Sequence, residues 1–349
     1  MTLKFMEQLP LKPELMTCPH CGSRQRIGIH SHQERRYICH ACGKTFAETQ
    51  GTVFFGLHYP IWVIVLVLTL LAHGCPVPAI VAAFFIDERT VLDWLHRGGQ
   101  HGKAVQAQVV CNGQVELGQV QADEIKVQTQ KGKIWIATAM SVFSRLFLWG
   151  EVSPKRDTGL VKRLMQKVRQ AASSTTQAVL IAVDGFAAYP KAVFQTFYTT
   201  VKTGRPGRPR HALWPDLHVV QVVKQYSGRA VQSISRRLVH GSLDRVYDII
   251  AMTQVGFGVI NTAFIERFNA TLRARLPALV RRTRTRSVAR ATQRLEDELF
   301  WGGVVYNFCT VHTSLEATPA VAAGLTDHTW SVEELLRLRL PRSALHAIV

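Results

Sequence analysis

Acidic residues are scarce in this chain. Of its 349 residues only 24 are Asp or Glu, against 42 Lys and Arg, so the formal net charge is +18. The stretch from Arg267 to Arg294 holds nine arginines and no acidic residue. So large a positive charge argues against an enzyme of small metabolites and favours a polyanionic partner, nucleic acid before an anionic membrane. A chain that is merely basic and soluble is the plainer alternative.

Long hydrophobic runs are lacking as well. The longest strongly apolar run, residues 61–72, is too short to span a bilayer, and Gly74 and Pro76 interrupt its continuation. Residues 1–15 show no apolar leader. We therefore expect no membrane partner and a cytoplasmic location. Three isolated cysteines fit the reduced thiols of that compartment: Cys75, Cys111 and Cys309.

The remaining cysteines form two CxxC pairs with 17 residues between them: Cys18, Cys21, Cys39 and Cys42. Two such pairs bring four thiolates to the corners of a tetrahedron, which is the arrangement of structural Zn²⁺ sites. Redox-active pairs or chance spacing are the alternatives. A closed shell of four thiolates leaves no open coordination position, so we expect residues 1–52 to form a zinc ribbon that contacts DNA or protein without catalysing a reaction.

Residues 53–103 are predicted to be helical, with helices at 61–72, 78–85 and 88–97. Asp87 precedes the last of them as a natural N-cap. A helix, a short helix, a tight turn and a further helix form the helix-turn-helix layout. Its last helix would present three side chains to a major groove of DNA: Arg89, Thr90 and Arg97. A small structural bundle gives the same pattern. Residues 98–118, rich in Gly, Gln and His, are interpreted as a linker.

The predicted catalytic domain spans residues 104–330. Three strands, a helix and a fourth strand open it, at 120–127, 133–142, 146–152, 157–171 and 178–183. This is the opening order of a ribonuclease H-like α/β fold. In that fold the first strand and the end of the fourth lie side by side, so Asp123 and Asp184 should converge.

A third carboxylate is predicted on a helix at 261–276, where Glu266, Asn269 and Arg273 share one face. Carboxylates at close range repel one another unless they are protonated or hold cations, and oxygen-rich sites suit Mg²⁺ or Mn²⁺. Two such ions would clamp the oxygens of an in-line phosphoryl displacement. Arg273 would then neutralise a phosphate, and Asn269 would contact DNA beside it.

Each of these residues also has a plainer interpretation. Asp123 could be a strand-surface residue, Asp184 a turn former, and Glu266 with Arg273 a surface charge pair. Other carboxylates compete as ligands: Glu124, Asp157 and the acidic cluster at 296–298. Glu124 ranks lower because alternation along the strand points it to the face opposite Asp123. The cluster ranks lower because it follows the arginine-rich tract.

At these residues the chain resembles the DDE transposases of bacterial insertion sequences. The most similar pattern is that of the insertion-sequence-one family, which joins a zinc finger, a helix-turn-helix and a DDE domain. The matching segments are QADEI around Asp123, AVDGFAAY around Asp184, NTAFIERFNATLR around Glu266, LVRRTRTRS, and YNFCTVHTSL followed by TPA. Arg273 stands seven residues after the glutamate, where such enzymes carry Lys or Arg. The resemblance covers nearly the whole chain, from Cys18 to about Leu336.

The resemblance implies metal-dependent cleavage at the terminal inverted repeats of an insertion sequence and transfer of the ends to target DNA. It implies double-stranded DNA as the partner, a homodimer or higher oligomer that brings two ends together, no small-molecule substrate, and a place at the bacterial nucleoid. The gap between Asp184 and Glu266 exceeds that of many DDE enzymes, so an insertion is expected at 198–258.

Basic residues in this gap, and in the tract after the last catalytic helix, are expected to bind DNA: Arg205, Arg208, Arg210, Arg281, Arg282, Arg284 and Arg286. The first three belong to an extended stretch that resembles a minor-groove hook, although a basic loop binding phosphates non-specifically fits equally well. Residues 299–312 are predicted to be an aromatic-rich helix on the core, and 331–349 a terminal helix and tail capped by Ser331.

Two other functions stay open from the sequence. One is a DNA-binding regulator that uses the ribbon and the helix-turn-helix above an inactive core. The other is a metal-dependent nuclease on the same core, which would cut strands without joining them.

Overall fold

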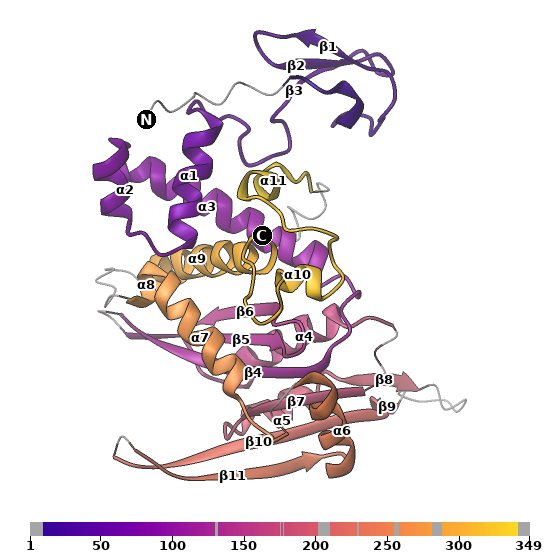
Figure 1. Ribbon diagram of the computed structural model, residues 1–349, viewed down its shortest axis with the longest axis vertical. Helices are drawn as coiled ribbons and strands as arrows, with labels where there is room; N and C mark the ends of the chain where they lie inside the picture. Colours follow the sequence, from indigo (N-terminus) through magenta and orange to yellow (C-terminus); the bar gives the residue numbers. More distant parts are fainter. Residues whose placement is uncertain are drawn as a thin grey trace.

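The computed structural model describes residues 10–129, 132–174, 176, 178–201, 210–228, 230–254, 258–280 and 288–340, apart from the side chains of residues 280 and 288–291. Along the long axis a small sheet stands at one end, helices lie in the middle, and a large sheet forms the other end (Figure 1). None of the helices in these ranges combines the length and apolar character that crossing a bilayer requires.

The small sheet belongs to the segment that carries the CxxC pairs. Its described strands are antiparallel, in the order β1 (Ile27–Ser31), β2 (Arg36–Cys39) and β3 (Thr45–Ala47). Its core is small: Tyr37 and Phe46, with ring centroids 5.6 Å apart, pack beside Cys18 and Cys39. A unit of this size does not bury enough apolar surface to fold by itself, which fits the four-cysteine cluster of a zinc ribbon.

Three helices follow as predicted: α1 (Ile61–Ala72), α2 (Val77–Phe84) and α3 (Glu88–Val105). Phe85 ends α2 in the left-handed conformation, with φ of 55°. The Asp87 carboxylate caps α3 by accepting a hydrogen bond from the Arg89 backbone N–H at 2.8 Å.

The linker predicted at 98–118 is wrong over its first half. Helix α3 continues to Val105 and runs into a π-helical turn, Gln106–Val110. The glycines of this stretch serve close packing: a Cβ on Gly99 would lie 2.5 Å from the Asp297 Cα atom on α9 (Val288–Cys309). Trp301 of α9 also donates from its indole N–H to the Leu68 carbonyl of α1 at 2.8 Å.

The C-terminal segment therefore packs against the N-terminal helices. Its described helices are α10 (Pro319–Ala322) and α11 (Val332–Arg337). Ser331 caps α11 as predicted, accepting from the Glu334 N–H at 3.0 Å. His101 of α3 approaches the Leu335 carbonyl to 2.8 Å. One hydrophobic core runs through α1, α3, α9, α11 and one face of the large sheet, across the predicted boundary at residue 103.

Among the described residues, six strands form the large sheet, in the order β11-β10-β7-β4-β5-β6. Their bounds are β4 (Gly118–Thr129), β5 (Gly132–Ser141), β6 (Phe147–Ser153), β7 (Ala178–Asp184), β10 (Asp216–Ser227) and β11 (Ala230–His240). The pairs β4–β5, β5–β6 and β10–β11 are antiparallel, whereas β4–β7 and β7–β10 are parallel. The fold is thus α/β with a mixed sheet, and all four predicted strands are present.

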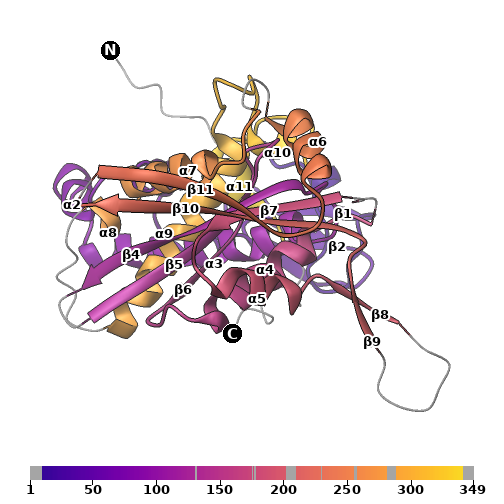
Figure 2. The same ribbon diagram turned by 90° about the horizontal axis from the view of Figure 1, so that it is seen from below.

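Helices cover both faces of this sheet (Figure 2). One face carries α4 (Thr158–Ala171) and α5 (Ala188–Phe194); the other carries α6 (Leu243–Thr253), α7 (Ala263–Arg275) and α9, and α8 (Pro277–Val280) follows α7. Side chains alternate between the faces: Val179 and Ile181 of β7 pack in the α4–α5 core, and Leu180 and Ala182 pack in the α6 core.

The insertion predicted at 198–258 is only partly separate from the sheet. Strand β10 pairs with β7 in parallel over seven residues, from Asp216↔Ala178 to Val222↔Asp184, so it belongs to the central sheet. The described part that projects is a short hairpin, β8 (Tyr198–Val201) and β9 (Arg210–Leu213) (Figure 2). Much of the long gap between the second aspartate and the glutamate is therefore filled by core strands.

Candidate functional site

Two of the predicted acidic residues meet at the sheet's centre. Strands β4 and β7 are parallel neighbours whose register runs to Ala122↔Val183, so Asp123 and Asp184 are next in line. One carboxylate oxygen from each of Asp123, Asp184 and Glu124 lies within 4.8 Å of the other two. Three carboxylates at this range offer the hard oxygen ligands that Mg²⁺ or Mn²⁺ prefers. A metal could therefore bind here.

Glu124 is the residue that the sequence interpretation ranked too low. Its side chain does leave β4 on the α4–α5 face, as alternation requires. Strand β7 ends at Asp184, so beyond this residue β7 no longer separates the α4–α5 face of the sheet from the face that Asp123 occupies. Glu124 is 92% buried by accessible area, since 8% is exposed. Its Oε2 accepts from Arg156 at 2.9 Å; Oε1 makes no hydrogen bond of normal geometry with the described atoms, although the buried Tyr189 hydroxyl lies beside Glu124.

The electrostatics of this cluster disfavour several negative charges at once. Burial raises the pKa of Asp123, and the nearby Asp184 and Glu266 charges add to the effect, while hydrogen bonds from the Glu124 backbone and Asn269 oppose it. Burial also raises the pKa of Glu124 to about 7, against the opposing hydrogen bond from Arg156. A divalent cation would compensate the repulsion and the desolvation that cause both shifts.

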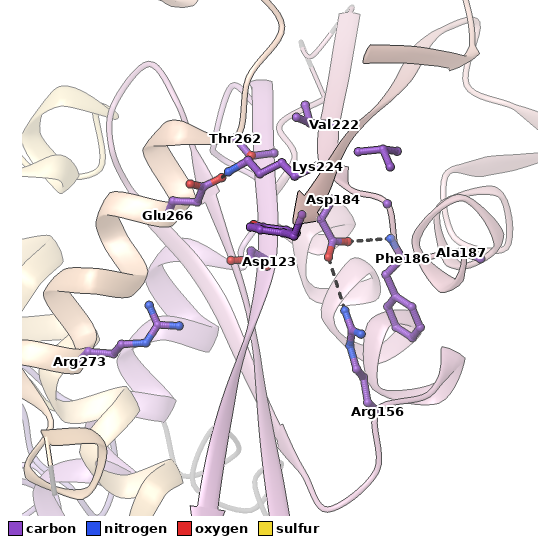
Figure 3. Close-up of a pocket in the computed structure, with 13 residues that line it drawn as sticks. Asp123, Arg156, Asp184, Phe186, Ala187, Val222, Lys224, Thr262, Glu266 and Arg273 are labelled. Atoms are coloured by element: carbon purple, nitrogen blue, oxygen red, sulfur yellow. Dashed lines mark hydrogen bonds and ion pairs between the residues drawn. The ribbon is translucent and has the colours of Figure 1, made fainter. Parts of the chain in front are cut away.

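Glu266 lies across the same cavity but outside the three-carboxylate cluster (Figure 3). Its Oε1 accepts from Lys224 Nζ at 2.6 Å and from Thr262 Oγ1 at 2.6 Å. The Glu266 side chain is 44% exposed. Of the three acids predicted to converge on one cation, only Asp123 and Asp184 do so; Glu124 is the third carboxylate of the cluster, and Glu266 binds Lys224 and Thr262 instead.

Asn269 does not face DNA as predicted. It is fully buried, donates from Nδ2 to Asp123 Oδ2 at 3.0 Å, and accepts from Thr138 Oγ1 at 2.8 Å. The helical spacing was right, but the side chain three residues after Glu266 points into the sheet. Asn269 therefore fixes the orientation of the Asp123 carboxylate.

The cavity that these residues line has a volume of about 760 Å³. Its acidic side holds Asp123, Asp184 and Glu266. Three basic side chains from separate parts of the chain line it as well: Arg156, Lys224 and Arg273. Arg273 is exposed and faces the cavity from α7, as the resemblance implied (Figure 3). A basic rim around an acidic floor suits a phosphate bound next to metal.

The other acidic candidates have structural roles elsewhere. Asp157 caps α4 by accepting from the Leu160 N–H at 2.9 Å. Asp297 lies 2.9 Å from His96, Glu296 pairs with Lys103, and Glu298 accepts from the Ala278 N–H. The lower rank given to 296–298 was correct, because these residues join α3, α8 and α9.

The four cysteines of the small sheet form a separate cluster, with all sulfur atoms within 4.8 Å. The Sγ atoms of Cys18 and Cys42 are 3.7 Å apart, as are those of Cys21 and Cys39. A tetrahedral shell with Zn–S bonds of about 2.3 Å separates its sulfurs by about 3.8 Å. The cluster therefore fits a structural Zn²⁺.

The residues predicted to contact DNA differ in how exposed and how free their side chains are. Arg89 is exposed at the start of α3, and Thr90 is half-buried beside it. Arg97 pairs with Asp93 at 2.9 Å and donates to the Phe55 carbonyl at 3.2 Å, so its guanidinium is already engaged. Arg210 is exposed on β9. The rest lie outside the described residues: Arg205, Arg208, Arg281, Arg282, Arg284 and Arg286.

Sequence reasoning ranked one residue of the site too low and missed two others. Glu124 was visible as the second acid of the Asp-Glu pair in QADEI, yet strand alternation argued against it. Lys224 was hidden because its strand was assigned to an insertion. Arg156, between β6 and α4, follows no pattern that marks it. Neither a scan of protein-family models nor a search of curated proteins finds a match to this chain.

Proposed function

We propose that this chain is a metal-dependent DNA transposase of the DDE class. The observation that carries the proposal is the meeting of Asp123 and Asp184 on neighbouring parallel strands, with Glu266 directed from a helix into the same cavity. Chemistry on DNA is favoured because the chain carries a net charge of +18 and basic side chains line this cavity.

The topology supports a ribonuclease H-like core. Three antiparallel strands, β4 to β6, are followed by α4 and then by β7, which returns parallel to β4. That return places the first strand beside the end of the fourth, which is the arrangement that the sequence interpretation required of this fold. Strand β10 then extends the sheet in parallel beyond β7.

The residues present fit a divalent metal, because Glu124 presents a buried oxygen that makes no hydrogen bond of normal geometry with the described atoms, beside two further carboxylates. When bound, two such ions polarise the attacking and leaving oxygens of an in-line phosphoryl displacement. The chain's own contribution is positional: Asn269 holds the Asp123 carboxylate, and Thr262 holds that of Glu266. Arg273 stands seven residues along α7 from Glu266, exposed for a phosphate of the DNA backbone.

The N-terminal segments would supply DNA binding. A Zn²⁺ held by the four cysteines would stabilise the small sheet and leave no open coordination position, and α2 and α3 would act as a helix-turn-helix with Arg89 exposed at the start of α3. Contacts between these modules and the ends of an insertion sequence would bring the DNA to the cavity. Joining two ends requires at least two copies of the chain, so we propose a homodimer or a higher oligomer.

The test is a supercoiled-plasmid assay with Mg²⁺, in which the plasmid carries the DNA that flanks the gene on both sides. We expect joined products from the wild type and none from Asp123→Asn or Asp184→Asn, which keep the shape of the side chain. Asp244→Asn, on the exposed start of α6, is the matched control and should join DNA normally. Nicked products alone would favour a nuclease, and band shifts without any cleavage would favour a regulator.

A further inference from the structure

The cavity contains two basic side chains that neither the motifs nor the resemblance assigned. Arg156 reaches it from the segment between β6 and α4, and Lys224 reaches it from β10. Figure 3 shows Lys224 on the Glu266 side and Arg156 on the Asp184 side. Arg156 is bound to two carboxylates of the three-carboxylate cluster, and Lys224 is bound to Glu266, the acidic side chain across the cavity.

Arg156 neutralises one side of the centre. Its Nη2 lies 2.9 Å from Glu124 Oε2 and 3.4 Å from Asp184 Oδ2. The guanidinium also stacks over two aromatic rings, 4.0 Å from the Phe186 centroid and 5.0 Å from that of Trp135. These rings hold the planar group in the cavity wall by contacts that do not depend on the carboxylates.

Lys224 neutralises the other side. Its Nζ donates to Glu266 Oε1 at 2.6 Å. The residue lies two positions beyond Val222, the last residue of β10 that pairs with β7, so its side chain emerges where the sheet opens into the cavity. A flexible lysine stem lets the ammonium move by a few ångströms without any movement of the strand.

A divalent cation competes with both basic groups for the same carboxylate oxygens. Once Asp184 and Glu266 coordinate a cation, the guanidinium and the ammonium lose most of the attraction that held them there, and the cation repels them. Both groups are anchored in the cavity wall, so they stay beside the site. Their best remaining partner is an anion that enters the cavity together with the metal.

We propose that Arg156 and Lys224 form a phosphate-binding pair that the carboxylates occupy until a divalent cation binds. The proposal rests on the proposed function in taking a phosphodiester of DNA as the anion. Arg273 would add a third contact to the same phosphate group or its neighbour. Metal and DNA should then bind cooperatively, because each one makes available the groups that the other needs.

The test compares Lys224→Met with Lys191→Met, a matched change at an exposed position of α5. Mn²⁺ binding is measured without DNA by electron paramagnetic resonance. Binding of a short fluorescein-labelled duplex is measured with Ca²⁺ and in metal-depleted buffer, at several salt concentrations. We expect Lys224→Met to bind Mn²⁺ about two- to fivefold more tightly, since a partly exposed ion pair that competed for Glu266 is gone.

We also expect the DNA affinity of Lys224→Met to fall only when Ca²⁺ is present. The salt dependence of its DNA binding should then be smaller by about one phosphate contact. Arg156→Lys keeps a charge beside Glu124 but cannot stack on Phe186 and Trp135, so it should melt slightly below the wild type and lose part of the same Ca²⁺-dependent DNA binding. An unchanged Mn²⁺ affinity in Lys224→Met, or an equal loss of DNA binding with and without Ca²⁺, would contradict the proposal that these side chains form a phosphate-binding pair. If the wild type binds no Mn²⁺, the proposed function fails as well. If the wild type binds Mn²⁺ but Lys224→Met and Arg156→Lys bind metal and DNA as Lys191→Met does, only this inference fails.

Discussion

Gly99→Ala should destabilise the protein by about 3 kcal/mol, although alanine is the better helix former. A Cβ at this position would lie 2.5 Å from the Asp297 Cα and 2.8 Å from its carbonyl oxygen. Carbon atoms pack at about 3.5–4.0 Å, so α3 and α9 would have to separate by about 1 Å. Because the obstacle is backbone, a change of rotamer cannot relieve it.

The magnitude follows from three contributions. Overpacking at a rigid contact costs about 3 kcal/mol. Moving α9 away also weakens the bonds from His96 and Gln100 to Asp297, both 2.9 Å, at about 0.5 kcal/mol each. Alanine returns about 1 kcal/mol through its helix propensity. The sum is a net loss of about 3 kcal/mol.

Urea denaturation followed by tryptophan fluorescence measures this difference. The matched control is Gly159→Ala near the start of α4, where the atoms nearest to a Cβ belong to side chains, Asp157 at 3.2 Å and Arg163 at 3.7 Å. We expect that variant to be neutral or more stable by up to about 1 kcal/mol. Equal stabilities for the two variants would refute the close contact between α3 and α9.

Three further changes have defined outcomes. Chelation of Zn²⁺, or Cys21→Ser, should abolish amide-exchange protection in β1–β3 and leave that of β4–β7 intact, because the small sheet has little core of its own. Asn269→Ala should lower Mn²⁺ affinity about 10- to 100-fold in a direct titration, because Asp123 loses its buried hydrogen bond. In buffer free of Mg²⁺ and Mn²⁺, the wild type should lose stability relative to Glu124→Gln as pH rises from about 4.5 to 7. As pH rises, the Glu124 carboxyl loses its proton in the unfolded chain before it does so in the folded protein, where its pKa is about 7. Above that pH the free energy of unfolding is therefore lower by about 3 kcal/mol. A constant difference in stability between the two proteins across this pH range would contradict the prediction.

The elements with strong local patterns were predictable. The run at 61–72, the alternation around Asp123 and the apolar strand before Asp184 each correspond to an observed element, because local periodicity and end signals determine them. The Ser331 cap is another local signal that the structure confirms. The meeting of Asp123 and Asp184 followed from topology, because a fourth strand that returns parallel to the first brings its end beside the middle of that strand.

What depended on distant contacts was not predictable. Gly98 and Gly99 look like linker residues in sequence, and only distant elements explain them: Leu68 of α1 and Trp301 of α9 pack against Gly98, and Asp297 of α9 packs against Gly99. The side chain of Asn269 points into the sheet because α7 rests on β4, which the helix's own pattern does not reveal. The participation of Glu124 depends on where the neighbouring strand ends.

Iron-mediated cleavage of the chain tests the central claim most directly. Fe²⁺ in place of Mg²⁺, with ascorbate and peroxide, cuts the backbone next to its ligands, and the fragments are mapped by mass spectrometry. The account predicts cuts beside Asp123, Asp184 and Glu266, all suppressed by excess Mg²⁺ and by Asp123→Asn. Cuts at only one of these three segments, or cuts that persist in Asp123→Asn, would show that the acidic side chains do not share a metal centre.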